Sequence, residues 1–262
     1  TFPREQSVGT LLAYYLCAFA IPFLFMSSGL FLLNRGRIYR NYPLRKAFNI
    51  IRLVILWNLI FDILRSMIQV YSIGRLSVEW LNVPQDIIKS FLQKGEMGHF
   101  WYLGALIIVY ILLPWMSQKS LESKRFLLFL IGTVCFIIQT ISLFIAYPLQ
   151  ADVIQTFRVW TWLFYFLLGS FIEVITSRLK NKIQFDAHLI LTVVVTGIVL
   201  AFHFYVGTRV ILLEGKILKA EYFYDSILDV IWVVLFFSLL LRINLSKRVK
   251  EFIQKFAGLT LV

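Results

Sequence analysis

Long apolar runs alternate with short polar connections along the whole chain. At about 1.5 Å per residue, each run crosses most or all of the roughly 30 Å core of a bilayer. The runs are Thr10–Leu33, Phe48–Tyr71, Phe100–Met116, Phe126–Tyr147, Phe157–Ile175, Leu189–Val206 and Ile227–Ile243. The pattern predicts an all-α fold, a polytopic bundle of about seven transmembrane helices in one membrane-embedded domain over residues 1–262.

The amino-acid composition agrees with a membrane protein, and the positions of the basic residues favour lipid over nucleic acid as its partner. Of the 262 residues, 60% are hydrophobic, whereas a soluble domain is about 45–50% apolar. The net charge of +12 would also suit a nucleic-acid-binding protein. However, the basic residues lie in short loops between apolar runs, where membrane topology places them. We therefore predict an integral membrane protein with lipid, not nucleic acid, as its surroundings.

The distribution of Lys and Arg predicts an orientation. Four alternate loops, 34–47, 117–125, 176–188 and 242–255, hold sixteen basic residues, and the N-terminal segment and the loops of the other side together hold seven. Basic loops stay on the cytoplasmic side. We expect a multi-pass protein of the cell membrane with Thr1 outside and the Asn34–Ala47 loop in the cytoplasm. The last residues open a further apolar run, so we also expect a fragment truncated at both ends.

The second predicted helix carries charge inside its apolar run. At 100° per residue, Asn58, Asp62, Arg65 and Gln69 share an arc of about 60°. One Asp or Arg at the centre of a membrane helix costs about 2.5–3.5 kcal/mol when it faces lipid. This stripe must therefore face protein or a wet cavity. It indicates either a site or pathway, or an interhelical hydrogen-bond seam that only fixes packing.

Two further groups have the chemistry of a site. Arg45 and Lys46 precede this helix and Arg52 lies inside its first turns, so the three have the charge to bind phosphate. The alternative is that they only set topology and contact lipid headgroups. His99, at the start of the third run, has the chemistry of a base, while Trp101 beside it is equally typical of an aromatic belt.

We expect several other polar or small residues to shape helix packing and not to form a site. Pro22 removes a backbone hydrogen bond from the first run, and Ser28 and Gly29 permit a kink or a close helix contact. We expect His188 and His203 to lie at the interface. Asp229 is expected to pair with Arg158, or either of these two to pair with Arg65. We interpret Cys17 and Cys135 as core residues, and no metal site is expected.

Four segments resemble the membrane-bound acyltransferase family 3. Phe19–Leu33, which reads FAIPFLFMSSGLFLL, resembles the family's P-x-F-F-x-x-S-G-x-x-L helix. The basic stretch Leu44–Arg52, followed by Leu56-Trp57-Asn58, is similar to its basic element ending in tryptophan. His99–Leu103, which continues to Tyr110 and Pro114, resembles its H-x-W-F-L helix, and Phe164–Gly169 its F-x-x-G helix.

The resemblance implies a function and a set of site residues. Family members move acyl groups, commonly acetyl, from cytoplasmic acyl-CoA to hydroxyls of extracytoplasmic glycans or glycolipids. It implies that Arg45, Lys46 and Arg52 bind the acyl-CoA donor. It also assigns the acyl passage or the acceptor to Ser28, Gly29, Asn58, Asp62, Arg65 and Trp101.

The resemblance places the catalytic general base on a histidine upstream of Thr1, and His99 is the alternative within the chain. A multi-pass transporter or flippase for a polar or lipid-linked substrate is the rival interpretation, since charged helices in a bundle are equally natural there.

Overall fold

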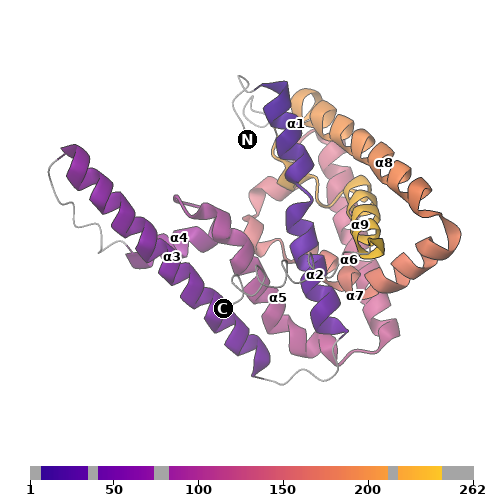
Figure 1. The fold of residues 1–262 in the computed structure, drawn as a ribbon, viewed down its shortest axis with the longest axis horizontal. Helices are drawn as coiled ribbons and strands as arrows, with labels where there is room; N and C mark the ends of the chain where they lie inside the picture. Colours follow the sequence, from indigo (N-terminus) through magenta and orange to yellow (C-terminus); the bar gives the residue numbers. More distant parts are fainter. Residues whose placement is uncertain (1–6, 35–40, 74–82, 212–217, 244–262) are drawn as a thin grey trace.

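The computed structural model describes residues 7–34, 41–73, 83–211 and 218–243, and these form a bundle of α-helices (Figure 1). The all-α prediction is confirmed. The helices are α1 Val8–Cys17, α2 Ala20–Leu33, α3 Tyr42–Ile73, α4 Val83–Phe91, α5 Trp101–Ser117, α6 Leu121–Phe144, α7 Val159–Lys182, α8 Phe185–Tyr205 and α9 Ile227–Arg242. Short 3₁₀ turns connect several of them.

The described residues contain six helical segments long and apolar enough to cross a membrane. They correspond to the first six predicted runs, and the chain is a multi-pass membrane protein. The seventh run is present as α9, which has 16 residues. A helix of that length reaches about 24 Å, which is less than the roughly 30 Å hydrocarbon core.

Helices α2 and α7 form the centre of the bundle (Figure 1). Gly29 of α2 lies directly against the backbone of α7. A Cβ at this position would come within 1.8 Å of the Phe166 carbonyl oxygen. Gly169 of α7 lies in the same way against α2, with a Cβ position 2.0 Å from the Met26 carbonyl oxygen. Two glycines thus let the helix backbones touch, which confirms the predicted close contact at Gly29.

The first predicted span is interrupted at Ala18–Phe19, one turn before Pro22. Proline has no N–H, so the carbonyl of Ala18 cannot receive its usual helical hydrogen bond. The hydroxyl of Tyr224 donates to that carbonyl instead, at 2.9 Å. The discontinuity between α1 and α2 is therefore closed by a side chain from the far end of the sequence.

Contacts between loops support the predicted alternation. At one end, which we call the polar end (residues 91–101, 147–158 and 218–229), Gln93 donates to Glu221 at 3.0 Å and Arg158 donates to the Glu221 carbonyl at 3.1 Å. At the opposite, basic end, Arg242 donates to the Ile183 carbonyl at 3.0 Å. Loops predicted to share a side do lie together, while their orientation relative to the cell stays a prediction.

Helix α3 lies at the edge of the bundle, where it contacts α4 and α5 (Figure 1). Only 17% of the residues in its 18-residue apolar stretch are buried within the structure. The helix α4 is described from Val83 onward, and residues 74–82 lie outside the described part of the chain. The observed α4 brings polar side chains against the one face of α3 that cannot face lipid.

Candidate functional site

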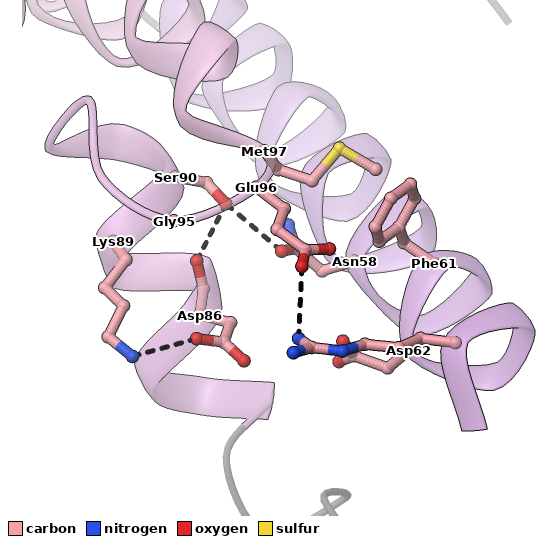
Figure 2. A pocket seen from close by; sticks show the side chains of 10 residues that line it. Asn58, Phe61, Asp62, Asp86, Lys89, Ser90, Gly95, Glu96 and Met97 are labelled. Carbon is pink, nitrogen blue, oxygen red and sulfur yellow. Dashed lines mark hydrogen bonds and ion pairs between the residues drawn. The ribbon is translucent and has the colours of Figure 1, made fainter. Parts of the chain in front are cut away.

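A polar pocket of about 180 Å³ lies between α3, α4 and the turn that follows α4. Figure 2 shows Asn58 and Asp62 of α3 facing Asp86, Ser90 and Glu96 across it. The lining residues are Asn58, Phe61, Asp62, Arg65, Asp86, Lys89, Ser90, Gly95, Glu96 and Met97. The polar stripe therefore faces a cavity, as its free-energy cost in lipid requires. Gln69, the fourth member of the stripe, has no described side chain.

Asn58 fixes the inner wall of the pocket. Its amide donates to the Val54 carbonyl one turn earlier at 2.8 Å, and its carbonyl oxygen accepts a hydrogen bond from Ser90 at 3.1 Å. Ser90 is almost fully buried and also donates to the Asp86 carbonyl at 2.7 Å. The interhelical seam considered from the sequence is thus present at Asn58, one turn before the pocket residue Asp62.

Opposite charges are paired around the pocket. Arg65 lies 3.4 Å from the Glu96 carboxylate. Lys89 lies 3.1 Å from Asp86 (Figure 2). Within the described residues, no three acidic, histidine or cysteine side chains are arranged to hold a metal ion. Carboxylates accept from hydroxyls and the two cations donate to them, so the lining suits a polar, hydroxyl-bearing ligand, with Phe61 as its apolar wall.

The predicted phosphate-binding residues lie on the first turns of the same helix. Arg45 is exposed, Lys46 is partly buried, and the exposed Arg52 guanidinium packs over the Phe48 ring at 4.3 Å. Seventeen residues of helix separate Arg45 from Asp62, about 25 Å. The basic and polar groups on α3 are therefore separated by most of a bilayer core. The other basic residues of the predicted loop, at positions 35–40, lie outside the described residues.

The remaining predicted site residues do not line the pocket. Gly29 is a helix contact and Ser28 is partly buried beside it. Trp101 is 7% exposed, with its ring 5.0 Å from that of Trp162 in the aromatic core. His99 is exposed, stacks edge-on against Phe100 at 4.5 Å, and follows the pocket residue Met97 by two positions.

The structure corrects the predictions for the other two histidines. His188 and His203 are fully buried, not interfacial. His203 lies 3.0 Å from Asp229, so the predicted Asp229–Arg158 pair is wrong. Asp229 and Arg158 were paired because the sequence places both near the same side of the membrane. In the structure, α8 packs on α9 and brings His203 to Asp229 instead. His188 contacts the Leu235 carbonyl at 3.1 Å and the Arg242 guanidinium at 2.9 Å.

The cysteine prediction is half right, since Cys135 is buried and Cys17 is exposed. Cys17 was predicted to lie in the core because it belongs to an apolar run. In a membrane helix, an apolar position faces lipid as readily as protein.

A buried polar cluster that was not predicted from the sequence lies at the polar end. Asp225 accepts hydrogen bonds from Thr161 at 2.6 Å and from the amide of Gln150 and the indole of Trp160, each at 3.3 Å. Burial raises the pKa of Asp225, and these hydrogen bonds oppose that rise. The partners of Asp225 come from two other segments of the chain, and no spacing rule in the sequence joins these segments.

A family model described as an acyltransferase domain matches residues 1–262. No curated protein and no solved structure matches the chain. The resemblance found in four short segments is thus confirmed over the full length.

Proposed function

Because the chain belongs to the membrane-bound acyltransferase family, we propose that it moves an acyl group, acetyl in the first instance, from cytoplasmic acyl-CoA to a hydroxyl of an extracytoplasmic glycan or glycolipid. The family match favours this enzyme over the transporter or flippase considered from the sequence. The acyl donor follows from the family, whereas acetyl-CoA and the glycan acceptor are our proposal.

The observation that carries the proposal is the layout of α3. One 32-residue helix bears the basic residues at its first turns and the polar pocket in its second half. The predicted orientation puts the basic turns at the cytoplasmic face, where coenzyme A is found. The pocket then lies toward the outer half of the bilayer, where a glycan hydroxyl is available.

For the donor, we assign phosphate contacts to Arg45 and Lys46, with Arg52 guiding the pantetheine arm. Guanidinium and ammonium groups bind phosphate oxygens through charge-assisted hydrogen bonds. All three side chains keep exposed area in the structure, so none has to leave a core contact to bind. For the acceptor, we assign Asp62 and Arg65, whose polar groups face the pocket.

The reaction forms one bond and breaks one bond. The acceptor hydroxyl oxygen attacks the thioester carbonyl carbon, a C–O bond forms, the C–S bond breaks, and coenzyme A leaves as its thiol. A general base takes the hydroxyl proton and returns it to the departing sulfur. The resemblance places this base upstream of Thr1; of the chain's three histidines, His99 is the exposed one.

Labelling of the acceptor from radioactive acetyl-CoA by the full-length protein in membranes tests the proposal. We expect Arg45→Ala/Lys46→Ala to raise the donor KM by roughly 30-fold, since each cation contributes about 1 kcal/mol to binding at a charged surface. The matched control is Lys180→Ala/Lys182→Ala, which removes two exposed cations from the end of α7. Equal donor KM values in the two double variants would refute the donor assignment. No labelling by the unchanged protein would refute the proposed reaction.

A further inference from the structure

A second cavity, separate from the polar pocket, lies on the exposed surface of α6 beside its contact with α7. It is an open apolar groove of about 520 Å³. Gly132, Phe164 and Leu168 form its floor, and the exposed rings of Phe129 and Phe136 form its walls. We call it the α6 groove.

The floor of the α6 groove exists because position 132 has no side chain. A Cβ on Gly132 would lie 2.8 Å from Cε2 of Phe164, closer than ordinary van der Waals contact. The glycine therefore keeps α6 close to the Phe164 ring and leaves the space above it open. Thr133 is the one uncharged polar side chain in the lining, and its hydroxyl donates to the Phe129 carbonyl at 2.9 Å. This hydroxyl therefore needs no hydrogen-bond acceptor from a ligand.

The groove has the length of one lipid chain. It starts at Arg125, in the second turn of α6, and ends at Phe136. Eleven residues of helix cover about 16 Å, and one leaflet contributes about 15 Å to the hydrocarbon core. The α6 groove thus runs from the level of the headgroups to the middle of the bilayer.

Its charge is confined to the headgroup end. Arg125 is exposed at the opening, the partly buried Lys124 precedes it, and no acidic side chain lines the groove. We propose that the α6 groove binds one acyl chain of an anionic phospholipid, with the lipid phosphate on the Arg125 guanidinium. Arginine favours phosphate oxygens through its planar set of donors, while a zwitterionic headgroup would bring its own cation to the same place.

Native mass spectrometry of the purified full chain tests this proposal, with phosphatidylglycerol and phosphatidylcholine of identical acyl chains as probes. We expect Arg125→Gln to weaken phosphatidylglycerol binding about fivefold and to leave phosphatidylcholine binding unchanged, as loss of one cation at a membrane surface predicts. Arg178→Gln, which removes an exposed cation from the same end outside the groove, is the control. The proposal is overturned if these two variants bind both lipids alike.

A second pair of variants tests the groove itself. Gly132→Leu fills the floor and should abolish retention of either lipid, whereas Gly197→Leu, at a glycine with open space around it, should retain both. If Gly132→Leu does not fold, Phe129→Ala replaces it, because that ring is 73% exposed and its loss leaves no core cavity. Phe129→Ala should weaken both lipids about tenfold, and unchanged binding in it would overturn the proposal.

Discussion

The hydroxyl of Tyr224 lies 2.9 Å from the carbonyl oxygen of Ala18, which Pro22 leaves without a helical donor. Two hundred residues apart in the sequence, these groups meet in a region where water is scarce. The carbonyl needs a partner there, since an unpaired buried polar group costs about 1–3 kcal/mol. The proline and the tyrosine thus act together. Pro22 removes the helical hydrogen bond to the Ala18 carbonyl, and the Tyr224 hydroxyl replaces it.

We predict that Tyr224→Phe lowers the free energy of unfolding by about 1–3 kcal/mol, because it removes the only side-chain donor to Ala18 among the described residues. Pro22→Ala in the same chain should recover part of this loss, since its new N–H restores the helical bond to Ala18. Reversible unfolding in mixed micelles measures both effects. Tyr205→Phe, on a ring that is 63% exposed, is the control. Additive losses in the double variant would contradict the proposed coupling.

A second prediction separates helix packing from an acyl passage at Gly29. Gly29→Ala and Gly169→Ala each place a Cβ about 2 Å from a backbone oxygen of the partner helix, so α2 and α7 must move apart. We expect each to destabilise the bundle by about 1–3 kcal/mol or more. Gly197→Ala, which meets nothing within 4 Å, should be neutral or slightly stabilising. If Gly29→Ala unfolds like the unchanged protein but blocks acyl transfer, Gly29 lines a passage after all.

The elements that the sequence predicted well are those set by local physics. Lipid requires long apolar helices, so six of the seven runs appear with the length needed to cross the membrane. The charge rule placed loops on shared sides, and the contacts of Glu221 and Arg242 agree. The cost of placing Asp62 and Arg65 in lipid predicted that they face protein or a wet cavity, and both side chains line the polar pocket.

The parts that the sequence could not predict depend on which helix neighbours which. Apolar helices carry little information about their partners, because lipid and protein solvate an apolar face equally well. Asp229 was therefore matched with Arg158 by depth, whereas α8 brings His203 to it. Trp101 was equally compatible with a site or a belt on sequence grounds, and it packs in the core against Trp162.

The buried pair of His203 and Asp229 yields a third prediction. The histidine is fully buried and its partner is 1% exposed, so removal of His203 leaves the buried Asp229 carboxylate with the Ser226 hydroxyl as its remaining side-chain donor among the described residues. We expect His203→Ala to cost about 3–5 kcal/mol of unfolding free energy. Replacing both residues by apolar ones should cost less than either single change. His99→Ala, at an exposed histidine, provides the comparison, and an equal loss there would argue against a specific pair.

The final prediction concerns the Arg65–Glu96 pair at the polar pocket. Both side chains are about half exposed, at 43% and 51%, and an ion pair of this kind contributes only about 0–1 kcal/mol to stability. Arg65→Gln should therefore leave the unfolding free energy nearly unchanged. If the pocket binds the acceptor, the same variant should raise the acceptor KM by roughly tenfold, the effect of losing one charge-assisted hydrogen bond, and leave the donor KM alone.

Charge reversal distinguishes a ligand-binding role for this pair from a purely structural one. In Arg65→Glu/Glu96→Arg the ion pair can re-form, but the positions of donor and acceptor groups in the pocket are exchanged. A structural pair should regain full activity in this double variant, whereas an acceptor site should stay impaired because the ligand's hydroxyls now meet the wrong partners. Arg178→Gln, far from the pocket on the last turns of α7, controls for loss of charge alone. Recovery of the acceptor KM in the double variant would therefore exclude Arg65 as an acceptor contact and assign it to holding the turn after α4 in place.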